Sequence, residues 1–122
     1  MAEYFFDTYA IIEILKGNPN YEHYTAVEYV TTQLNLIELH YYMLRHFGEA
    51  AAEVSMGKML KNVVPFDAGI IAAANKFRFK NKPKEFSTAD CIGYAYALKH
   101  GLKFVTGAKE FAGLPNVEFV MK

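Results

Sequence analysis

The stretch FFDTYAIIEIL, residues 5–15, contains the transition that decides the fold. Two bulky aromatic residues suit a short buried strand, and Asp7 follows them directly. From Thr8 onward, isoleucine and leucine recur at helical spacing, until Gly17 and Pro19 end the pattern. A strand that passes straight into a helix is typical of α/β proteins, in which such junctions gather at the carboxyl edge of a parallel sheet.

The rest of the chain repeats this alternation of strand and helix. Besides the first strand, we predict strands over TTQLNL (31–36), VVPF (63–66), LKFVTG (102–107) and VEFVM (117–121). After the first helix, the predicted helices cover residues 21–29, 37–48, 48–62, 67–79 and 87–101. These elements predict an α/β fold, with a single domain over residues 1–122. A central parallel sheet of about five strands would be covered by helices on both faces.

The composition is that of an ordinary globular protein and excludes several function classes. Of the 122 residues, 52% are hydrophobic, and 13 basic residues balance 13 acidic ones, so no overall positive field attracts nucleic acid. The single cysteine, Cys91, excludes an intrachain disulfide framework and a zinc site with cysteine spacing, and it predicts a cytoplasmic location. No apolar run approaches the roughly 20 residues that cross a bilayer, and no signal-peptide pattern opens the chain, so we expect no membrane contact.

Four acidic residues lie where the predicted elements meet the carboxyl edge. Asp7 ends the first strand, Glu38 follows the second and Glu110 follows the fourth. Asp90 opens a helix instead. We expect the preceding helix to descend from this edge, and residues 80–87 to form an extended return of roughly 26 Å that brings Asp90 back to it. The four carboxylates are therefore predicted to converge.

Each of these acids also has a simpler interpretation as a helix cap. Asn35 to Glu38 and Ser87 to Asp90 both fit a polar cap followed three residues later by an acid, and Asp7 can cap the first helix. Singly, an acid in such a place is more often a cap than a ligand. Four carboxylates on one edge, however, repel one another unless a cation or protons neutralise them. Ligation by oxygen alone favours Mg²⁺ or Mn²⁺ over zinc.

Other chemistries lack their motifs. The chain has no GxxxxGK phosphate loop and no GxGxxG after the first strand, and neither of its serines, Ser55 and Ser87, lies in a nucleophile-elbow motif. A haloacid-dehalogenase-like phosphatase also uses an acid after its first strand. That chemistry typically presents D-x-D, whereas Asp7 precedes Thr8 and Tyr9. Phosphatase chemistry is therefore the weaker enzymatic alternative.

The order of these motifs resembles that of the PIN-domain ribonucleases, especially the VapC-type toxins of prokaryotic toxin–antitoxin pairs. The resemblance extends over nearly the whole chain. It consists of D-T after the first strand, an acid opening a helix (NLIELHYY), S-x-x-D opening an alanine- and tyrosine-lined helix (STADCIGYAYA), and V-T-G-x-K-E-F. It implies a three-layer α/β/α sandwich that hydrolyses RNA phosphodiester bonds with Mg²⁺ or Mn²⁺. It also implies a homodimer and a cognate antitoxin as partner.

The resemblance assigns roles to individual residues. Asp7, Glu38 and Asp90 match the family's metal-binding carboxylates. We expect Asp7 and Asp90 to hold the metal, and Glu38 to complete its shell or to orient the attacking water. Supporting roles, as small hydroxyl residues or as the residue that opens a helix, are implied for Thr8, Thr106 and Ser87.

One position departs from the family pattern. Family members usually carry Asp where this chain has Ala108, while Glu110 keeps the second acid of the turn. We therefore expect Glu110 to take part in catalysis, and the activity to be reduced rather than absent. The alternative is a PIN domain that has lost catalysis and binds RNA or an antitoxin without cutting.

Two further segments are candidates for contact with partners. KFRFKNKPK, residues 76–84, carries five basic residues, and we expect RNA contacts from its lysines and from the lysine beside Glu110. These are Lys80, Lys82, Lys84 and Lys109. The two phenylalanines of the segment are expected to face the core. Large apolar residues between 41 and 60 are expected to be mostly core, with the rest forming an antitoxin groove or a dimer face.

Overall fold

Four strands form one parallel sheet in the computed structural model, which describes residues 2–121. The strands are β1 (Tyr4–Phe6), β2 (Tyr29–Val30), β3 (Lys103–Thr106) and β4 (Val117–Phe119), in the spatial order β2-β1-β3-β4. β1 lies inside the sheet, because Phe5 pairs with Val30 of β2 on one side and with Phe104 of β3 on the other. The parallel sheet predicted from the sequence is confirmed.

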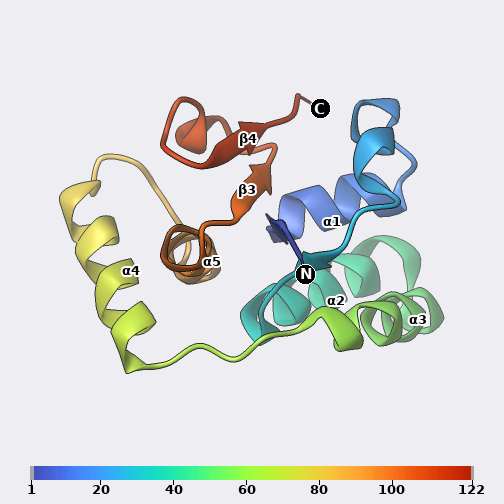
Figure 1. Cartoon of the computed structure of the whole chain (residues 1–122). Helices are drawn as coiled ribbons and strands as arrows, with labels where there is room; N and C mark the ends of the chain where they lie inside the picture. The colour runs from blue at the N-terminus through green and yellow to red at the C-terminus, as the bar shows by residue number, and fades with distance from the viewer. Residues whose placement is uncertain (1, 122) are drawn as a thin grey trace.

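Within the same residues, five α-helices and three short 3₁₀ segments connect and cover the strands (Figure 1). The α-helices are α1 (Thr8–Leu15), α2 (Gln33–Phe47), α3 (Glu49–Met59), α4 (Ala68–Lys80) and α5 (Thr88–His100). The 3₁₀ segments are η1 (Pro19–Tyr24), η2 (Leu60–Asn62) and η3 (Lys109–Phe111). Figure 1 shows α4 as the outermost helix on the left, α5 between α4 and the strands, and α2 and α3 together at the lower right.

Alternating strand residues supply two apolar clusters, one on each face of the sheet. On one face, Phe5 and Phe104 pack with residues of α4 and α5. On the other face, Phe6 and Val105 pack with residues of α1, η1, α2 and α3. Neighbouring residues serve opposite clusters because side chains alternate across a strand. Helices therefore cover both faces, which confirms the three-layer α/β/α sandwich.

The segment TTQLNL (31–36) does not form the predicted strand. The observed strand β2 has two residues and ends at Val30, before this segment, and α2 begins directly after Thr32. The reason is a helix cap: Oδ1 of Asn35 accepts hydrogen bonds from the Thr32 backbone N–H at 3.2 Å and from the Thr32 hydroxyl at 2.7 Å. The predicted cap at Asn35 is therefore also wrong, and Glu38 lies inside α2 instead of after a strand.

The segment VVPF (63–66) contributes one isolated bridge instead of a strand. Thr31 pairs with Val63 in parallel orientation: its N–H donates to the carbonyl of Asn62 at 2.9 Å, and its carbonyl accepts from the N–H of Val64 at 2.8 Å. Pro65 has no N–H and cannot extend the pairing. The sheet thus has four strands within residues 2–121, where about five were predicted.

The link between α4 and α5 also differs from the prediction. Residues 81–84 form a turn rather than an extended return. Arg78 near the end of α4 donates to Thr88 at the start of α5 at 3.0 Å. At the other end, Asp67 before α4 pairs with Lys99 of α5 at 3.5 Å. The two helices are therefore antiparallel. α4 ends at the carboxyl edge, whereas the prediction had it descend from that edge, and α5 begins at the same edge after a short turn.

α5 lies close on the sheet because Gly93 has no side chain. A Cβ at Gly93 would be 2.6 Å from the ring of Phe5 and 3.2 Å from the ring of Phe104. Real Cβ atoms do not come so near to an aromatic carbon, so a larger residue would push the helix away. The close approach holds the first turn of α5 beside the ends of β1 and β3.

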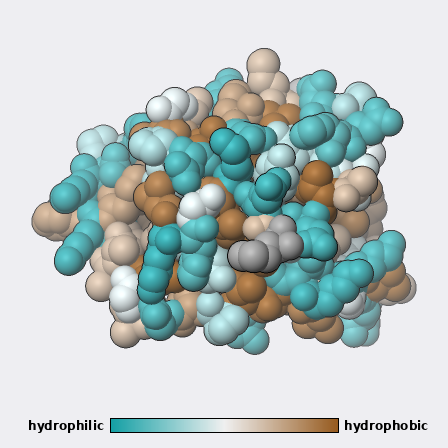
Figure 2. Space-filling view, in the orientation of Figure 1, coloured by the Kyte–Doolittle hydropathy of each residue, from teal (hydrophilic) through white to brown (hydrophobic). Residues whose placement is uncertain are grey.

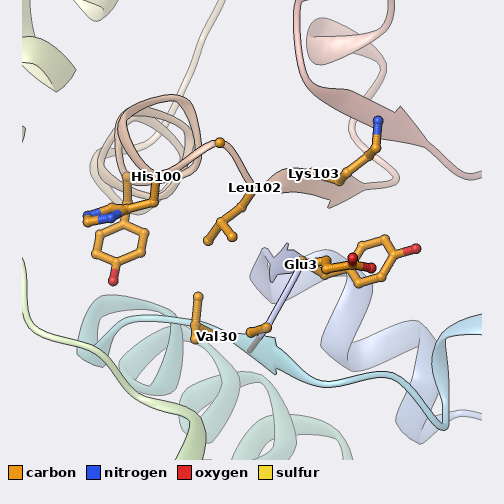
Figure 3. A pocket seen from close by; sticks show the side chains of 9 residues that line it. Glu3, Val30, His100, Leu102 and Lys103 are labelled. Carbon is orange, nitrogen blue, oxygen red and sulfur yellow. The ribbon is translucent and has the colours of Figure 1, made fainter.

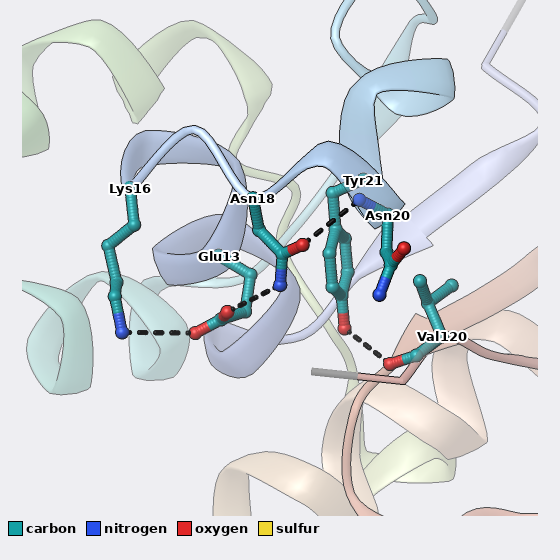
Figure 4. Close-up of polar contacts among 6 residues, drawn as sticks. All are labelled: Glu13, Lys16, Asn18, Asn20, Tyr21 and Val120. Atoms are coloured by element: carbon teal, nitrogen blue, oxygen red, sulfur yellow. Dashed lines mark hydrogen bonds and ion pairs between the residues drawn. The ribbon is translucent and has the colours of Figure 1, made fainter.

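A polar cluster joins the end of α1 to the last strand (Figure 4). Glu13 is buried, and its carboxylate accepts a hydrogen bond from Nδ2 of Asn18 at 2.8 Å and lies 3.5 Å from the Lys16 ammonium. The hydroxyl of Tyr21 donates to the carbonyl of Val120, just after β4, at 2.9 Å. These contacts hold α1 and η1 in place against the sheet.

The surface mixes polar and apolar residues, and Figure 2 shows brown hydrophobic patches divided by teal hydrophilic side chains. Large apolar residues of α2, α3 and η2 are more exposed than expected, because these helices pack largely on each other. The exposed ones are Tyr41, Leu44, Phe47, Val54 and Leu60. Among residues 2–121, no helix combines the length and the apolar character needed to cross a membrane.

Candidate active site

Asp7 lies where β1 passes into α1, and its side chain is only 2% exposed. Its Oδ1 accepts a hydrogen bond from the Ala10 N–H at 2.8 Å and so caps α1, as one interpretation of the sequence predicted. Its Oδ2 accepts a hydrogen bond from the Thr106 hydroxyl at 2.5 Å. Each carboxylate oxygen has two lone pairs and keeps one for a further partner. The same side chain can therefore cap the helix and bind a cation.

Thr106 ends β3 and is fully buried beside Asp7. Its Oγ1 accepts a hydrogen bond from the Ala108 N–H at 3.0 Å, so the hydroxyl proton points to Asp7. Gly107, between Thr106 and Ala108, has no space for a side chain, because a Cβ there would overlap the ring of Tyr9 on α1. β3 and α1 are thereby held together at the predicted site.

Glu38 is held by a chain of hydrogen bonds that starts at the cap of α2. Nδ2 of Asn35 donates to Oγ1 of Thr8 at 3.1 Å, and the Thr8 hydroxyl donates to Oε1 of Glu38 at 2.6 Å. Asn35 is itself fixed by its hydrogen bonds from Thr32. Glu38 reaches the site although it does not directly follow a strand, because it lies three residues after Asn35 and residues three apart on a helix share one face.

Asp90 lies in the first turn of α5 and forms the predicted capping box with Ser87. Oγ of Ser87 accepts a hydrogen bond from the Asp90 N–H at 3.0 Å, and Oδ2 of Asp90 accepts one from the Ser87 N–H at 2.9 Å. The cap uses only one oxygen of the carboxylate, so Asp90, like Asp7, has capacity for another partner.

Burial and mutual repulsion shift three carboxyl groups in the same direction. Burial raises the pKa of Asp7 to about 7; its hydrogen bonds oppose this shift, and the charges of Asp90 and Glu38 add to it. Burial likewise raises the pKa of Glu38 and the pKa of Asp90. The charge of Asp90 acts on Glu38, and the charge of Glu110 acts on Asp90. The four acids therefore form one electrostatic group.

The donor atoms of this group fit a hard divalent cation. They are carboxylate oxygens, which Mg²⁺ and Mn²⁺ prefer, and a bound cation would offset both the burial and the mutual repulsion that raise the pKa values. In the part of the chain that the structure describes, no three side chains of His, Cys, Asp or Glu lie close enough together to hold an ion by themselves. Water or substrate oxygens would complete the shell, as is usual for Mg²⁺.

The turn after β3 contains Glu110 and Ala108, and the two side chains have different environments. Glu110 is exposed on η3, at the rim of the site rather than in its buried centre. Ala108 precedes η3, and its side chain packs against the aromatic cluster on the α5 face of the sheet. The side chain offers no carboxylate to the site, but the backbone N–H of Ala108 donates to Thr106 and so supports it.

The lysines predicted to contact RNA are all exposed, and the structure brings two of them together. Lys82 and Lys84, with Arg78, line a hollow of about 500 Å³ beside the start of α5. Lys80 ends α4 and Lys109 begins η3, and neither lines this hollow.

The two phenylalanines of the basic segment have different environments. Phe77 packs against the aromatic cluster, as expected. Phe79 is 67% exposed, so the expectation that it faces the core is wrong. Residues two apart on a helix point in nearly opposite directions, which is why only one of the pair can be buried.

Another cavity lies at the opposite edge of the sheet. It encloses about 560 Å³, and Figure 3 shows Glu3, Val30, His100, Leu102 and Lys103 around it. This is the amino edge, at the end of α5 farthest from Asp90. Glu3 is the single acid of its lining, so the cavity offers no group of carboxylates. The carboxyl edge remains the candidate active site.

Sequence reasoning missed the roles of three residues that shape the site: Thr32 and Arg78 were given none, and Asn35 was expected to be the cap itself. Thr32 and Asn35 fell inside the predicted strand, although a Thr followed three residues later by Asn is itself a cap pattern. Arg78 was one of five basic residues in its segment. Its hydrogen bond to Thr88 depends on the packing of α4 on α5, which local sequence does not show.

Comparison with known proteins identifies a family over most of the chain. The family model described as PIN domain matches residues 4–116. Comparison with curated proteins gave no significant match.

Solved structures share the fold over nearly the whole length. A toxin–antitoxin complex from Klebsiella pneumoniae is similar with a TM-score of 0.74 and 20% identity, covering 94% of this chain and 95% of that chain. The Mycobacterium tuberculosis toxin VapC20, described as cleaving the sarcin–ricin loop, has a TM-score of 0.70 at 19% identity over 88% and 90% of the two chains. VapBC2 from Rickettsia felis, bound to a DNA fragment of its promoter, has a TM-score of 0.73 at 17% identity over 96% and 98%.

Proposed function

The chain belongs to the PIN domain family, and from this premise we propose that it is a metal-dependent endoribonuclease, a toxin of the VapC type. The observation that carries the proposal is the buried Asp7 between β1 and β3, coupled electrostatically to Glu38 and Asp90 at the carboxyl edge. A toxin described as cleaving the sarcin–ricin loop is among the proteins that share the fold, which supports RNA as the substrate class.

The chain's own residues would hold the metal and orient the reactants. Asp7 and Asp90 would hold Mg²⁺ or Mn²⁺, and Glu38 would either complete the shell or orient the attacking water as a base. When bound, the ion lowers the pKa of water and neutralises charge that develops on the phosphate. Thr106 keeps Asp7 in place by its hydrogen bond. Glu110 takes the place of the acid that is missing from the turn.

RNA would reach this site over the exposed basic residues around the start of α5. The proposed contacts are Lys80, Lys82, Lys84 and Lys109. Because the protein has no net charge, attraction of RNA depends on this local group, and the contacts should weaken as salt is added.

The proposed partners are a cognate antitoxin and a second copy of the chain. Complexes of a toxin with its antitoxin are among the proteins of the same fold. The exposed apolar residues of α2 and α3 offer a surface for either partner. We also propose a cytoplasmic location, because Cys91 is a free, buried thiol.

The proposal is tested by incubating the purified protein with a structured RNA in the presence of Mn²⁺ or of a chelator. We expect cleavage only with the metal, and none from the Asp7→Asn variant, which keeps the size of the side chain and an acceptor for the α1 cap. Glu3→Gln at the amino edge serves as the control and should cleave like the unmodified protein. Metal-dependent cleavage that persists in Asp7→Asn would contradict the proposed role of Asp7.

The same experiment decides the alternative of a PIN domain that binds without cutting, which the absence of an acid at Ala108 favours. In that case RNA binds, but no cleavage appears with Mn²⁺ or with chelator. A phosphatase would differ again, because its acid would be trapped as a phosphoenzyme.

A further inference from the structure

A hollow of about 500 Å³ lies between the end of α4 and the start of α5. Three cations, one acid and two further residues line it: Arg78, Lys82, Lys84, Glu85, Phe86 and Ser87. The lining therefore carries an excess of positive charge, although the whole chain is neutral. A volume of this size accommodates a small ligand or one unit of a larger one.

The hollow adjoins the candidate active site. Ser87, which lines it, exchanges two hydrogen bonds with Asp90. The ammonium group of Lys84 donates to the backbone carbonyl of Glu110 at 3.0 Å. The positive charge of Arg78 also acts on Asp90 and favours its ionised form. A chain molecule that has one unit at the acids would therefore place a neighbouring unit in the hollow.

Two of the three cations of the hollow are held in position by hydrogen bonds without being neutralised. The guanidinium of Arg78 is fixed by donating to the Thr88 hydroxyl at 3.0 Å. Lys84 is fixed by a carbonyl, which carries no net charge. Among residues 2–121, neither Arg78, Lys82 nor Lys84 forms a salt bridge with a carboxylate. Positioned cations without an acidic partner favour an anion, and phosphate suits both arginine and lysine.

An exposed aromatic ring adjoins these cations. Phe79 is 67% exposed, and the Lys82 ammonium lies 4.4 Å from the centroid of its ring. Lys82 covers one face of the ring, which leaves the opposite face for a planar partner. A ring next to phosphate-binding cations is the arrangement that binds single-stranded nucleic acid, with a base stacked on the ring and the backbone on the cations.

We propose that this hollow and the adjoining ring of Phe79, which lies outside the lining, form a nucleotide subsite: Arg78, Lys82 and Lys84 bind a backbone phosphate of RNA, and Phe79 stacks on an unpaired base next to the cleavage position. The inference deepens the proposed function and rests on it for the identity of the substrate as RNA. It adds a requirement for unpaired RNA beside the cleaved bond, because a base inside a duplex cannot stack on a side chain.

The test measures binding rather than cleavage. A fluorescently labelled single-stranded RNA is titrated with the Asp7→Asn protein in chelator, and anisotropy is followed over a range of salt concentrations. In this background, Phe79→Ala should weaken binding about ten-fold, and Phe79→Trp should restore it. Arg78→Gln and Lys82→Gln should each reduce the slope of log affinity against log salt by about 0.7. A fully paired duplex of the same sequence should bind more weakly than the single strand.

Matched controls separate these effects from loss of structure. Leu98→Ala removes another exposed apolar side chain, on α5, and Lys103→Gln removes an exposed charge at the amino edge. Both should leave affinity and salt slope unchanged. Circular dichroism confirms that each variant is folded, as expected for exposed positions.

The outcomes for the subsite and for the proposed function differ. If the unmodified protein cleaves RNA with metal, but Phe79→Ala and Arg78→Gln bind RNA as tightly as their parent, the subsite is wrong and the nuclease stands. If binding falls as expected but no metal-dependent cleavage is found, the subsite stands and the nuclease is wrong. Phe79→Ala that binds RNA normally but changes the sedimenting mass would assign the ring to a protein interface and overturn the inference.

Discussion

The hydroxyl of Thr8 accepts one hydrogen bond and donates another, and the backbone dictates this direction. The backbone N–H of Thr32 can only donate, so the oxygen of Asn35 must face it. The amide nitrogen of Asn35 then faces Thr8, whose proton is left for Glu38. A buried cap thus sets the orientation of a proposed catalytic carboxylate.

Thr8→Val tests this orientation, because valine has the shape of threonine without the hydroxyl. We expect kcat for RNA cleavage to fall about ten-fold with little change in KM, since Glu38 loses a partner that positions it. Thr8→Ser keeps the hydroxyl and should retain most of the activity. Equal losses in Val and Ser variants would show that the methyl group matters and the hydrogen bond does not.

Ala108 is the second residue at which a single substitution is informative. Its N–H would be unchanged by most replacements, and its position before η3 suits an aspartate cap. We expect Ala108→Asp to tighten Mn²⁺ binding about ten-fold, equivalent to about 1.4 kcal/mol, and to raise the cleavage rate at limiting metal. Calorimetric titration and initial rates measure the two effects.

Ala108→Asn is the matched control, because it has the size of aspartate without the charge. It should leave metal affinity near that of the unmodified protein. If both variants behave alike, the missing acid does not explain any weakness of the site. The side chain would then matter mainly through its packing on the aromatic cluster.

At the scale of elements, local signals predicted α1 and α5 well because their caps and ends are local. Asp7 and Ser87 begin these helices, and Gly101 ends the second in the left-handed conformation that glycine favours. Prediction failed at 31–36, because alternating Leu34 and Leu36 favour a strand, whereas the polar cap at Thr32 starts a helix. It failed again for the α4–α5 link, because the direction of a helix depends on packing between elements.

The candidate site was predictable to a similar degree. Asp7 follows from its place between β1 and α1, and Asp90 from its place in the capping box that opens α5. Glu38 was located for the wrong reason, since it occupies the second turn of α2, and its link to Thr8 spans 30 residues. Such contacts depend on how separate elements pack, so the pattern of either segment alone does not contain them.

Two glycines in helices should respond oppositely to the same substitution. A Cβ at Gly57 in α3 meets nothing within 4 Å, so Gly57→Ala should raise the free energy of unfolding by about 1 kcal/mol. A Cβ at Gly93 would press on Phe5, so Gly93→Ala should lower it by about 1–3 kcal/mol. Urea unfolding measures both. Stabilisation by Gly93→Ala would show that α5 does not lie as close on the sheet as described.

At the scale of the whole molecule, the acids connect the fold to the site. Asp7 joins β1 to β3 through Thr106, and Thr8 joins α1 to α2 through Glu38. The carboxyl groups are drawn together by packing on both faces of the sheet. Stability and metal binding should therefore depend on each other.

The free energy of unfolding should also depend on pH, with a definite sign. Burial raises the pKa of Asp7 from 3.8 to about 7, so between these values the folded protein binds more protons than the unfolded chain. Unfolding free energy should then fall as pH rises from about 4 to about 7, by up to about 4 kcal/mol from this group. The raised pKa values of Glu38 and Asp90 act in the same direction.

Denaturant unfolding in chelator, compared at pH 5 and pH 8, measures this loss. Asp7→Asn carries no titrating group at that position, so its stability should fall less over the same interval and exceed that of the unmodified protein at pH 8. Mg²⁺ at about 100 times its dissociation constant should restore about 2.7 kcal/mol to the unmodified protein at pH 8 and little to the variant. If the metal stabilises both proteins equally, it binds elsewhere, and the carboxyl edge is not the metal site.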